Sequence, residues 1–134
     1  MTRNGDTVFA TAETVGRWER RLTVLEETMR MGTIRKGSMV VAELAADPAN
    51  DGTTMLAVMF DPAGPGTGGM GHCVVAPGKV SRACVRADAE GSLRILVDVN
   101  SGADRGTLTV TENGEPMRTE RVRGYTAWTY SVVG

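Results

Sequence analysis

The sequence predicts a mainly β (α+β) domain, an antiparallel sandwich or small barrel of seven to eight strands with one N-terminal amphipathic helix. Three observations predict this class. From Ile34 onward, apolar residues recur in short runs with a period of two, which is typical of strands. The chain of 134 residues contains 17 glycines, which suit many tight turns. Only residues 15–29 carry a helical spacing of apolar side chains instead.

The composition indicates a single globular domain over residues 1–134. Hydrophobic residues make up 41% of the chain and charged residues 23%, close to the average of globular domains. Aromatic residues make up only 4%, so we expect an aliphatic core that uses many of the eight methionines.

The charge and hydropathy of the chain argue against several classes of partner. A net charge of −1 gives no overall field for nucleic acid or for an anionic membrane, and the arginines are interleaved with glutamates. No run approaches the roughly 18 apolar residues of a membrane span. The first six residues lack the apolar segment of a secretory signal, so we expect cytoplasmic synthesis. We therefore predict no nucleic-acid partner and no membrane partner.

The first quarter of the chain is predicted to contain an extended arm or short strand over residues 1–12 and a helix over residues 14–31. Thr14 can cap the start of this helix, and Gly32 can end it. The β-domain is expected to follow over residues 34–133.

An apolar stripe with heptad spacing lies on the predicted helix. It consists of Val15, Trp18, Leu22, Leu25 and Met29. In this register Arg21 takes a g position and Glu26 the next e position, the spacing of a salt bridge between parallel helices. A helix that lies on a sheet needs a similar stripe. We predict these seven residues as an interface, either with the chain's own sheet or with other copies in a homo-oligomer such as a trimer.

Short apolar runs bounded by turn residues define the predicted strands. They cover residues 38–45, 54–60, 72–75, 80–85, 93–99, 108–111, 117–122 and 125–133. The run over 54–60 is almost continuously apolar, which predicts a buried strand. The dipeptide Asn113–Gly114 predicts a hairpin with a type I′ turn.

The turn near Pro77 and Gly78 allows two arrangements of the cysteines. If Gly78 is the first central residue, the turn is type II′ and Cys73 lies directly opposite Cys84 across a hairpin, the arrangement we favour. If Pro77 and Gly78 are both central, the turn is type II, the strands splay and the cysteines are diagonal. Facing thiols would stay reduced in the cytoplasm and could cross-link outside the cell.

No motif in the sequence predicts catalysis, a cofactor or a metal. Residues 66–71 match G-x-G-x-x-G, but they precede a strand, whereas a dinucleotide site needs a helix there. His72, Cys73 and Cys84 lack a fourth ligand and the C-x-x-C spacing of zinc sites. Asp98, an acid within a predicted strand, is interpreted as a charge at a sheet edge. We therefore expect a protein without a cofactor that is not an enzyme.

A short heptad helix, Trp18-Glu19-Arg20-Arg21-Leu22 onward, runs into a small Gly- and Thr-rich β-domain. This arrangement resembles the decoration, tail and baseplate proteins of tailed phages. The resemblance covers the whole chain and is architectural. It implies a non-enzymatic structural subunit of a symmetric assembly, such as a virion, which contacts other copies and other subunits through its helix, termini and Gly-rich loop.

Two alternative functions follow from other features. Residues 25–44, including Gly32-Thr33-Ile34-Arg35-Lys36-Gly37-Ser38-Met39-Val40-Val41, resemble the junction of coiled coil and β-domain in Gre-type transcript cleavage factors. This resemblance implies a regulator that binds RNA polymerase and, without the acidic-tipped helical hairpin, has no cleavage activity. A small barrel could also bind or cyclise an apolar small molecule by enclosing and orienting it, which leaves little motif in the sequence.

Overall fold

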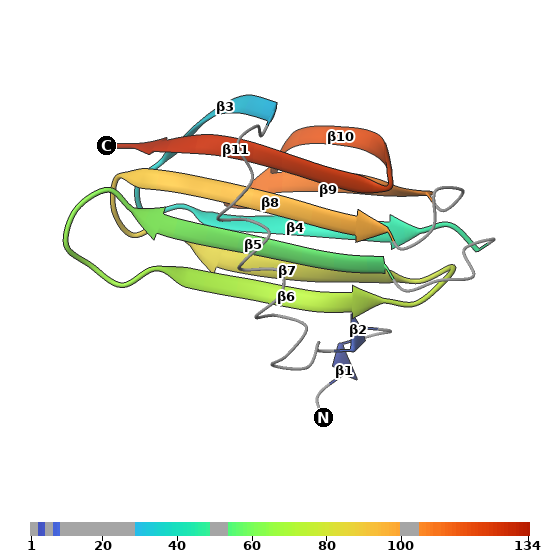
Figure 1. Cartoon of the computed structure of the whole chain (residues 1–134). Coiled ribbons are helices and arrows are strands. Elements are labelled where there is room, and N and C mark those ends of the chain that lie inside the picture. The colour runs from blue at the N-terminus through green and yellow to red at the C-terminus, as the bar shows by residue number, and fades with distance from the viewer. Residues whose placement is uncertain (1–2, 5–6, 9–28, 49–53, 100–104) are drawn as a thin grey trace.

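The computed structural model describes residues 3–4, 7–8, 29–48, 54–99 and 105–134. These residues form eleven strands in two sheets that pack face to face (Figure 1). The large sheet has the order β1 (Arg3–Asn4), β2 (Thr7–Val8), β6 (Gly69–Val75), β5 (Thr54–Pro62), β8 (Gly91–Val99), β11 (Tyr125–Val133) and β3 (Met29–Arg35). The small sheet has the order β10 (Glu115–Arg123), β9 (Arg105–Glu112), β4 (Met39–Ala46) and β7 (Val80–Arg86).

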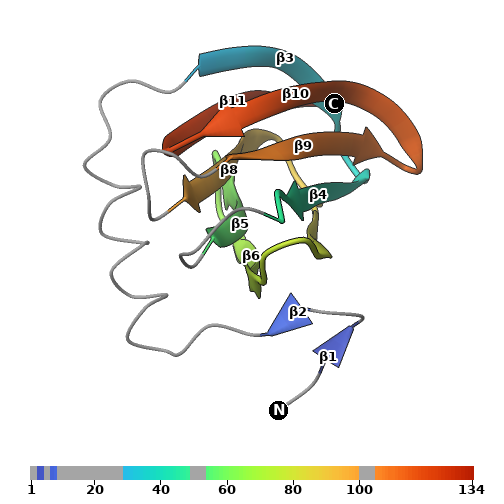
Figure 2. The ribbon, with the colours of Figure 1, turned by 90° about the vertical axis from the view of Figure 1, so that its right-hand side faces the viewer.

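The sandwich prediction is confirmed, and the barrel alternative is wrong because the two sheets do not join into a closed barrel. All neighbouring strands pair antiparallel except β3 and β11, which run parallel. In Figures 1 and 2, β3 and β10 lie along one side of the sandwich, with β6 on the opposite side.

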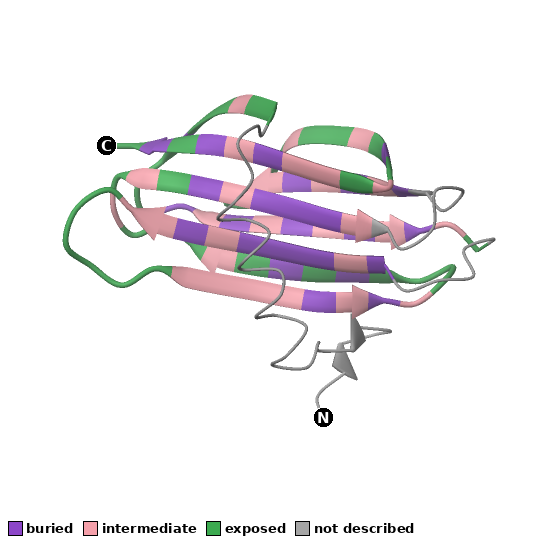
Figure 3. Cartoon of the chain, in the orientation of Figure 1, coloured by how far each residue is buried: buried purple, intermediate pink, exposed green. Residues whose placement is uncertain are grey.

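Strict alternation of side chains places the core between the sheets. Every second residue of β4 is buried, and Figure 3 shows the buried residues concentrated in central strands such as β5 and β8. The largest fully buried side chains include Trp128 and Tyr130 of β11, and Phe60 of β5 is also buried. These large side chains therefore pack between the two sheets.

Each of the eight strands predicted from residue 38 onward is present, usually extended by one to three residues at an end. The predicted buried strand over 54–60 lies in β5, between β6 and β8. The predicted type I′ hairpin is confirmed, since Asn113 and Gly114 have φ of 51° and 86° and link the paired residues Glu112 and Glu115.

The end of the predicted helix is wrong. Met29 and Met31 belong to β3, whose backbone pairs with β11, so pairing across the chain outweighs the local helical spacing. Gly32 does not end a helix; it has φ of 140° and lies beside an irregularity in the pairing of β3. The rest of the helix prediction, over residues 14–28, lies outside the described residues. Within the predicted arm, β1 and β2 are short strands.

The favoured arrangement of the cysteines is also wrong. The Lys79 amide donates to the Ala76 carbonyl at 3.1 Å, and Gly78 has φ of 73°, so Pro77 and Gly78 are the central residues, as in a type II turn. The turn does not close a hairpin, because β6 belongs to the large sheet and β7 to the small sheet. Both cysteines are free thiols.

A turn over residues 35–38 carries the chain from the large sheet to the small sheet. The Glu112 carboxylate accepts hydrogen bonds from the Arg35 amide at 2.9 Å and from the Ser38 hydroxyl at 2.6 Å. The neighbouring Asn113 accepts at its side-chain oxygen from the Met39 amide at 2.9 Å. The β9–β10 hairpin therefore holds the crossing turn in place.

The glycines of β6 allow the two sheets to approach closely along one side. A Cβ atom at Gly71 would overlap the backbone carbonyl oxygen of Cys84 in β7, and one at Gly69 would lie 2.9 Å from Val85 Cγ2. A side chain at either position would push β6 away from β7.

We expect Gly71→Ala to lower the free energy of unfolding by about 1–3 kcal/mol, because the added methyl group overpacks against backbone that cannot move aside. Urea denaturation measures this change. Gly64→Ala is the matched control, since nothing lies within 4 Å of a methyl group there, and it should change stability by less than about 0.5 kcal/mol. Equal effects of the two variants would contradict the close approach.

The Glu112 carboxylate should make stability depend on pH. The Ser38 hydroxyl, then the Arg35 amide and charge, lower the pKa of Glu112 below its ordinary value. The folded state therefore favours the ionised form. This contribution is complete above the unfolded pKa of about 4.3 and is lost as the pH falls through the lower folded pKa.

We expect Glu112→Gln to reduce stability at pH 7 and to remove part of the loss seen in the wild type on acidification from pH 5 to pH 3. The urea midpoint, measured over this range, reports the change. Glu115→Gln, at an exposed position across the same hairpin, should alter the profile far less. Parallel profiles for the wild type and Glu112→Gln would argue against the carboxylate contacts.

Candidate interaction surface

The predicted helix interface cannot be assembled from the described residues. Val15, Trp18, Arg21, Leu22, Leu25 and Glu26 lie outside them. Met29, the remaining member, begins β3, and its side chain is 58% exposed. The prediction that these residues form an interface stays a prediction.

The Gly-rich run at residues 66–71 serves packing in this fold. Gly69 and Gly71 lie within β6, where they meet β7, and a Cβ at Gly68 would lie 2.6 Å from the Phe60 carbonyl oxygen. The run enters a strand, as the sequence predicted, so its amides are not arranged at a helix N-terminus for a phosphate. Residues 63–68 form an exposed loop.

His72, Cys73 and Cys84 do not converge on one point. His72 and Cys73 are neighbours in β6, so their side chains leave opposite faces of the large sheet, and Cys84 is exposed on the small sheet. Burial raises the pKa of the Cys73 thiol to about 12. Among the described residues, no group of three His, Cys, Asp or Glu side chains could hold a metal ion.

Asp98 does not lie at a sheet edge, contrary to the interpretation of the sequence. It belongs to β8, a central strand, where it is paired with Met55 of β5 on one side and Tyr125 of β11 on the other. The charged side chain of Asp98, between two valines, therefore lies on the outward-facing side of a central strand.

The outer face of the small sheet presents threonines and small apolar side chains together with a few charged ones. We call it the threonine face; it comprises Val41, Glu43, Ala45, Val80, Arg82, Cys84, Thr107, Thr109, Thr111, Thr119 and Arg121. The alternate residues of the same strands, such as Ala42, Leu44, Leu108 and Val110, are buried in the core. Period-two geometry therefore fixes which side chains this face presents.

The register of the strands places the four threonines together. Thr109 of β9 is paired with Thr119 of β10, and their hydroxyls lie 3.2 Å apart within hydrogen-bond distance. Thr107 and Thr111 flank Thr109 on β9 at two-residue steps. Val41 lies beside Thr111 on β4. The result is a patch of short β-branched side chains.

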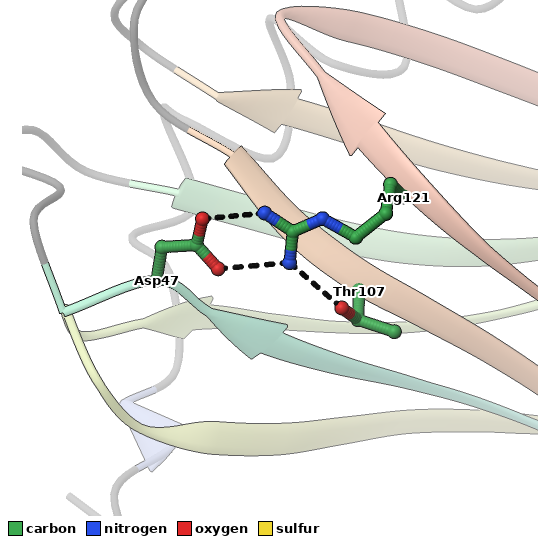
Figure 4. Close-up of polar contacts among 3 residues, drawn as sticks. All are labelled: Asp47, Thr107 and Arg121. Carbon is green, nitrogen blue, oxygen red and sulfur yellow. Dashed lines mark hydrogen bonds and ion pairs between the residues drawn. The ribbon is translucent and has the colours of Figure 1, made fainter.

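Ion pairs border this patch. Arg121 donates two hydrogen bonds to the Asp47 carboxylate, at 2.9 and 2.5 Å, and one to the Thr107 hydroxyl at 2.9 Å (Figure 4). These bonds to Asp47 raise the pKa of the Arg121 guanidinium. Arg82 pairs with Glu43 at 2.7 Å across β7 and β4. The border carries both signs of charge.

Two of the sheet edges, β10 and β3, are poorly suited to adding another strand. The edge strand β10 contains Pro116, which has no amide hydrogen, and its pairing shifts register between Pro116 and Arg118. At the edge of the large sheet, β3 is interrupted opposite Thr129 and Tyr130. We therefore expect contacts with other molecules to form on faces of the sandwich.

Two hollows lie beside the ion pair between Arg94 and Asp61. One, of about 560 Å³, is lined in part by Glu90, and the other, of about 360 Å³, in part by Met59 and Met70. Both are open to solvent. Neither encloses a small molecule as a buried apolar site would.

The described residues thus define a two-sheet β-sandwich with a threonine-rich outer face on its small sheet. Comparisons with family models, curated proteins and solved structures return no match for this chain. None of the described residues forms a helix able to cross a membrane.

The period-two pattern of the sequence contained part of the threonine face. Thr107, Thr109 and Thr111 alternate with residues that the pattern assigns to the core, so their common face could have been predicted. Which strands flank them depends on sheet order, and no local signal in the sequence indicates that order.

We expect the two cysteines to differ sharply in reactivity. Cys84 is exposed and should react quickly with a thiol reagent such as Ellman's reagent, whereas buried Cys73, with its raised pKa, should react only after unfolding. Native protein should titrate one thiol per chain, and protein in urea two. Cys84→Ser should abolish the fast reaction. A fast reaction in that variant would contradict the burial of Cys73.

Proposed function

We propose that the protein is a non-enzymatic structural subunit of a symmetric assembly and that the threonine face forms a contact between subunits. The patch of threonines on this face, flanked by two ion pairs, is the single observation that carries the proposal. The architectural resemblance to decoration, tail and baseplate proteins makes a phage virion the setting we propose for such an assembly.

The composition of the face suits a protein interface. Interfaces are depleted of charged residues at their centre and carry polar groups at their rim. The threonines of β9 and β10 form the uncharged part here. The pair Arg121–Asp47 lies at one end of it, and Glu43, paired with Arg82, lies directly beside Thr109. Because β-branched side chains have few rotamers, they lose little conformational entropy when a partner covers them.

The charges at the border favour self-association about a twofold axis. In such a contact the same patch meets itself, so it has to be self-complementary. The pairs Arg82–Glu43 and Arg121–Asp47 carry both signs on one face, and a second copy rotated by 180° can place unlike charges opposite one another. Sheets stacked in this way lie about 10 Å apart, close enough for the threonines to touch.

Thr109→Arg tests this contact. Analytical ultracentrifugation of the wild type from micromolar to millimolar concentration should show reversible self-association. The variant adds a long charged side chain at the centre of the face, so we expect its dissociation constant to rise at least about tenfold, which corresponds to about 1.4 kcal/mol.

Ser131→Arg is the matched control. Ser131 is exposed on β11, on the outer face of the other sheet, and the same substitution there should leave association unchanged. A wild type that stays monomeric at millimolar concentration, or equal weakening by the two variants, would overturn the proposal.

A further inference from the structure

The outer face of the large sheet carries a second apolar cluster, separate from the core. Ala57 and Leu96 are buried there, and Met55, Met59 and Ala127 pack against them. The alternate residues of these strands, such as Leu56 and Val97, point into the core. We call these five residues, Met55, Ala57, Met59, Leu96 and Ala127, the outer cluster.

The outer cluster forms a shallow trough that runs across the strands. The backbone register aligns one row across β6, β5, β8 and β11, consisting of His72, Ala57, Leu96 and Ala127. Because the alanine side chains are short, this row rises less above the sheet than its neighbours. Met55 and Met59 stand in the rows on either side of Ala57, so longer side chains border the trough on β5.

Something covers this trough. Leu96 and Ala57 are each 0% exposed, although the side chains of one sheet face form a single layer and the small sheet packs on the opposite face. The Nδ1 atom of His72 and the Nε atom of Arg94, which project from the same outer face, are buried as well. A single layer does not exclude water from its own upper surface, so burial of these side chains needs a further layer over this face.

The path of the chain identifies what can provide this layer. β2 ends at Val8, paired with Val74 on one side of the large sheet, and β3 begins at Met29, paired with Trp128 at the opposite edge. Residues 9–28 must therefore cross four strands. The core fills the inner face, which leaves the outer face as the route open to this connection, between the level of Val74 and a level just beyond Ala127.

The length of the segment fits the crossing. Five strand spacings of about 4.8 Å separate β2 from β3, a span of roughly 24 Å. The part of the predicted helix that precedes β3, residues 14–28, would be roughly 22 Å long at 1.5 Å per residue. Its apolar stripe repeats along one side, as a helix needs to cover a sheet.

We propose that the trough is the docking surface for the apolar stripe of the chain's own segment 15–28, with Trp18, Leu22 and Leu25 seated on the outer cluster. The heptad residues then serve the fold of one chain and do not join copies. This inference goes beyond the proposed function and is independent of it, because the assembly contact lies on the threonine face of the other sheet.

The test uses the full chain labelled with 5-fluorotryptophan, in the Thr109→Arg background so that the threonine face does not associate. The chain has two tryptophans, and Trp18→Phe assigns their ¹⁹F resonances. We expect the Trp18 resonance to show little solvent isotope shift between H₂O and D₂O in a monomer defined by ultracentrifugation. Trp128, buried in the core, provides the internal reference.

Ala57→Glu places a charge in the trough and should give Trp18 the solvent isotope shift of free tryptophan while the Trp128 resonance stays in place. Ser92→Glu, at an exposed position on neighbouring β8, is the control and should move neither. If Ala57→Glu disturbs Trp128 as well, Leu22→Glu provides the same test from the segment side, because it alters none of the described strands.

Two outcomes would overturn the proposal. A Trp18 resonance with the full solvent shift in the monomer would show that the segment does not dock. Protection of Trp18 that disappears on dilution from dimer to monomer would show that the trough is covered by a second copy. Failure of association through the threonine face would contradict only the proposed function and would leave this result unaffected.

Discussion

The turn between β3 and β4 is the constraint on which the sandwich depends, because there the chain passes from one sheet to the other. The Lys36 amide donates to the Val133 carbonyl at 2.8 Å, and the Gly37 amide to the Ala87 carbonyl at 2.6 Å. The Glu112 carboxylate accepts from the same turn. Three segments distant in sequence therefore meet in one short turn and fix the sheets relative to each other. If the turn did not make these hydrogen bonds, its backbone amides and the carbonyls that accept from them would lack partners at the end of the core.

The sequence predicts those parts of the fold that depend on neighbouring residues. Alternation located the strands, and Asn113–Gly114 located a hairpin, because side-chain period and positive φ are local properties. The Pro77–Gly78 turn was misassigned because its residues suit two turn types, and only the membership of β6 and β7 in different sheets decides between them. Met29 was misassigned because β11, about one hundred residues later, supplies its backbone partner.

The two candidate surfaces show the same division. The alternation of Thr107, Thr109 and Thr111 is visible in the sequence. That Val41 and Thr119 are their neighbours on adjacent strands follows from the sheet order. The outer cluster was not visible at all. Its members come from three strands. A central strand with apolar residues on both faces reads in the sequence as one continuous apolar run, so the sequence does not show which of these residues face outward.

The parallel pairing of β3 with β11 also bears on how the chain reaches its fold. Met29 is paired with Trp128, and Arg35 with Val133, so the edge of the large sheet cannot close before residues 128–133 have been synthesised. Loops of that length close late, and domains dominated by such distant pairings fold slowly, over milliseconds to seconds. During synthesis, the apolar surface of β8 stays exposed until β11 pairs with it, and until then it can contact other chains. The need for chaperones should therefore be greatest in the interval between the synthesis of β8 and that of β11.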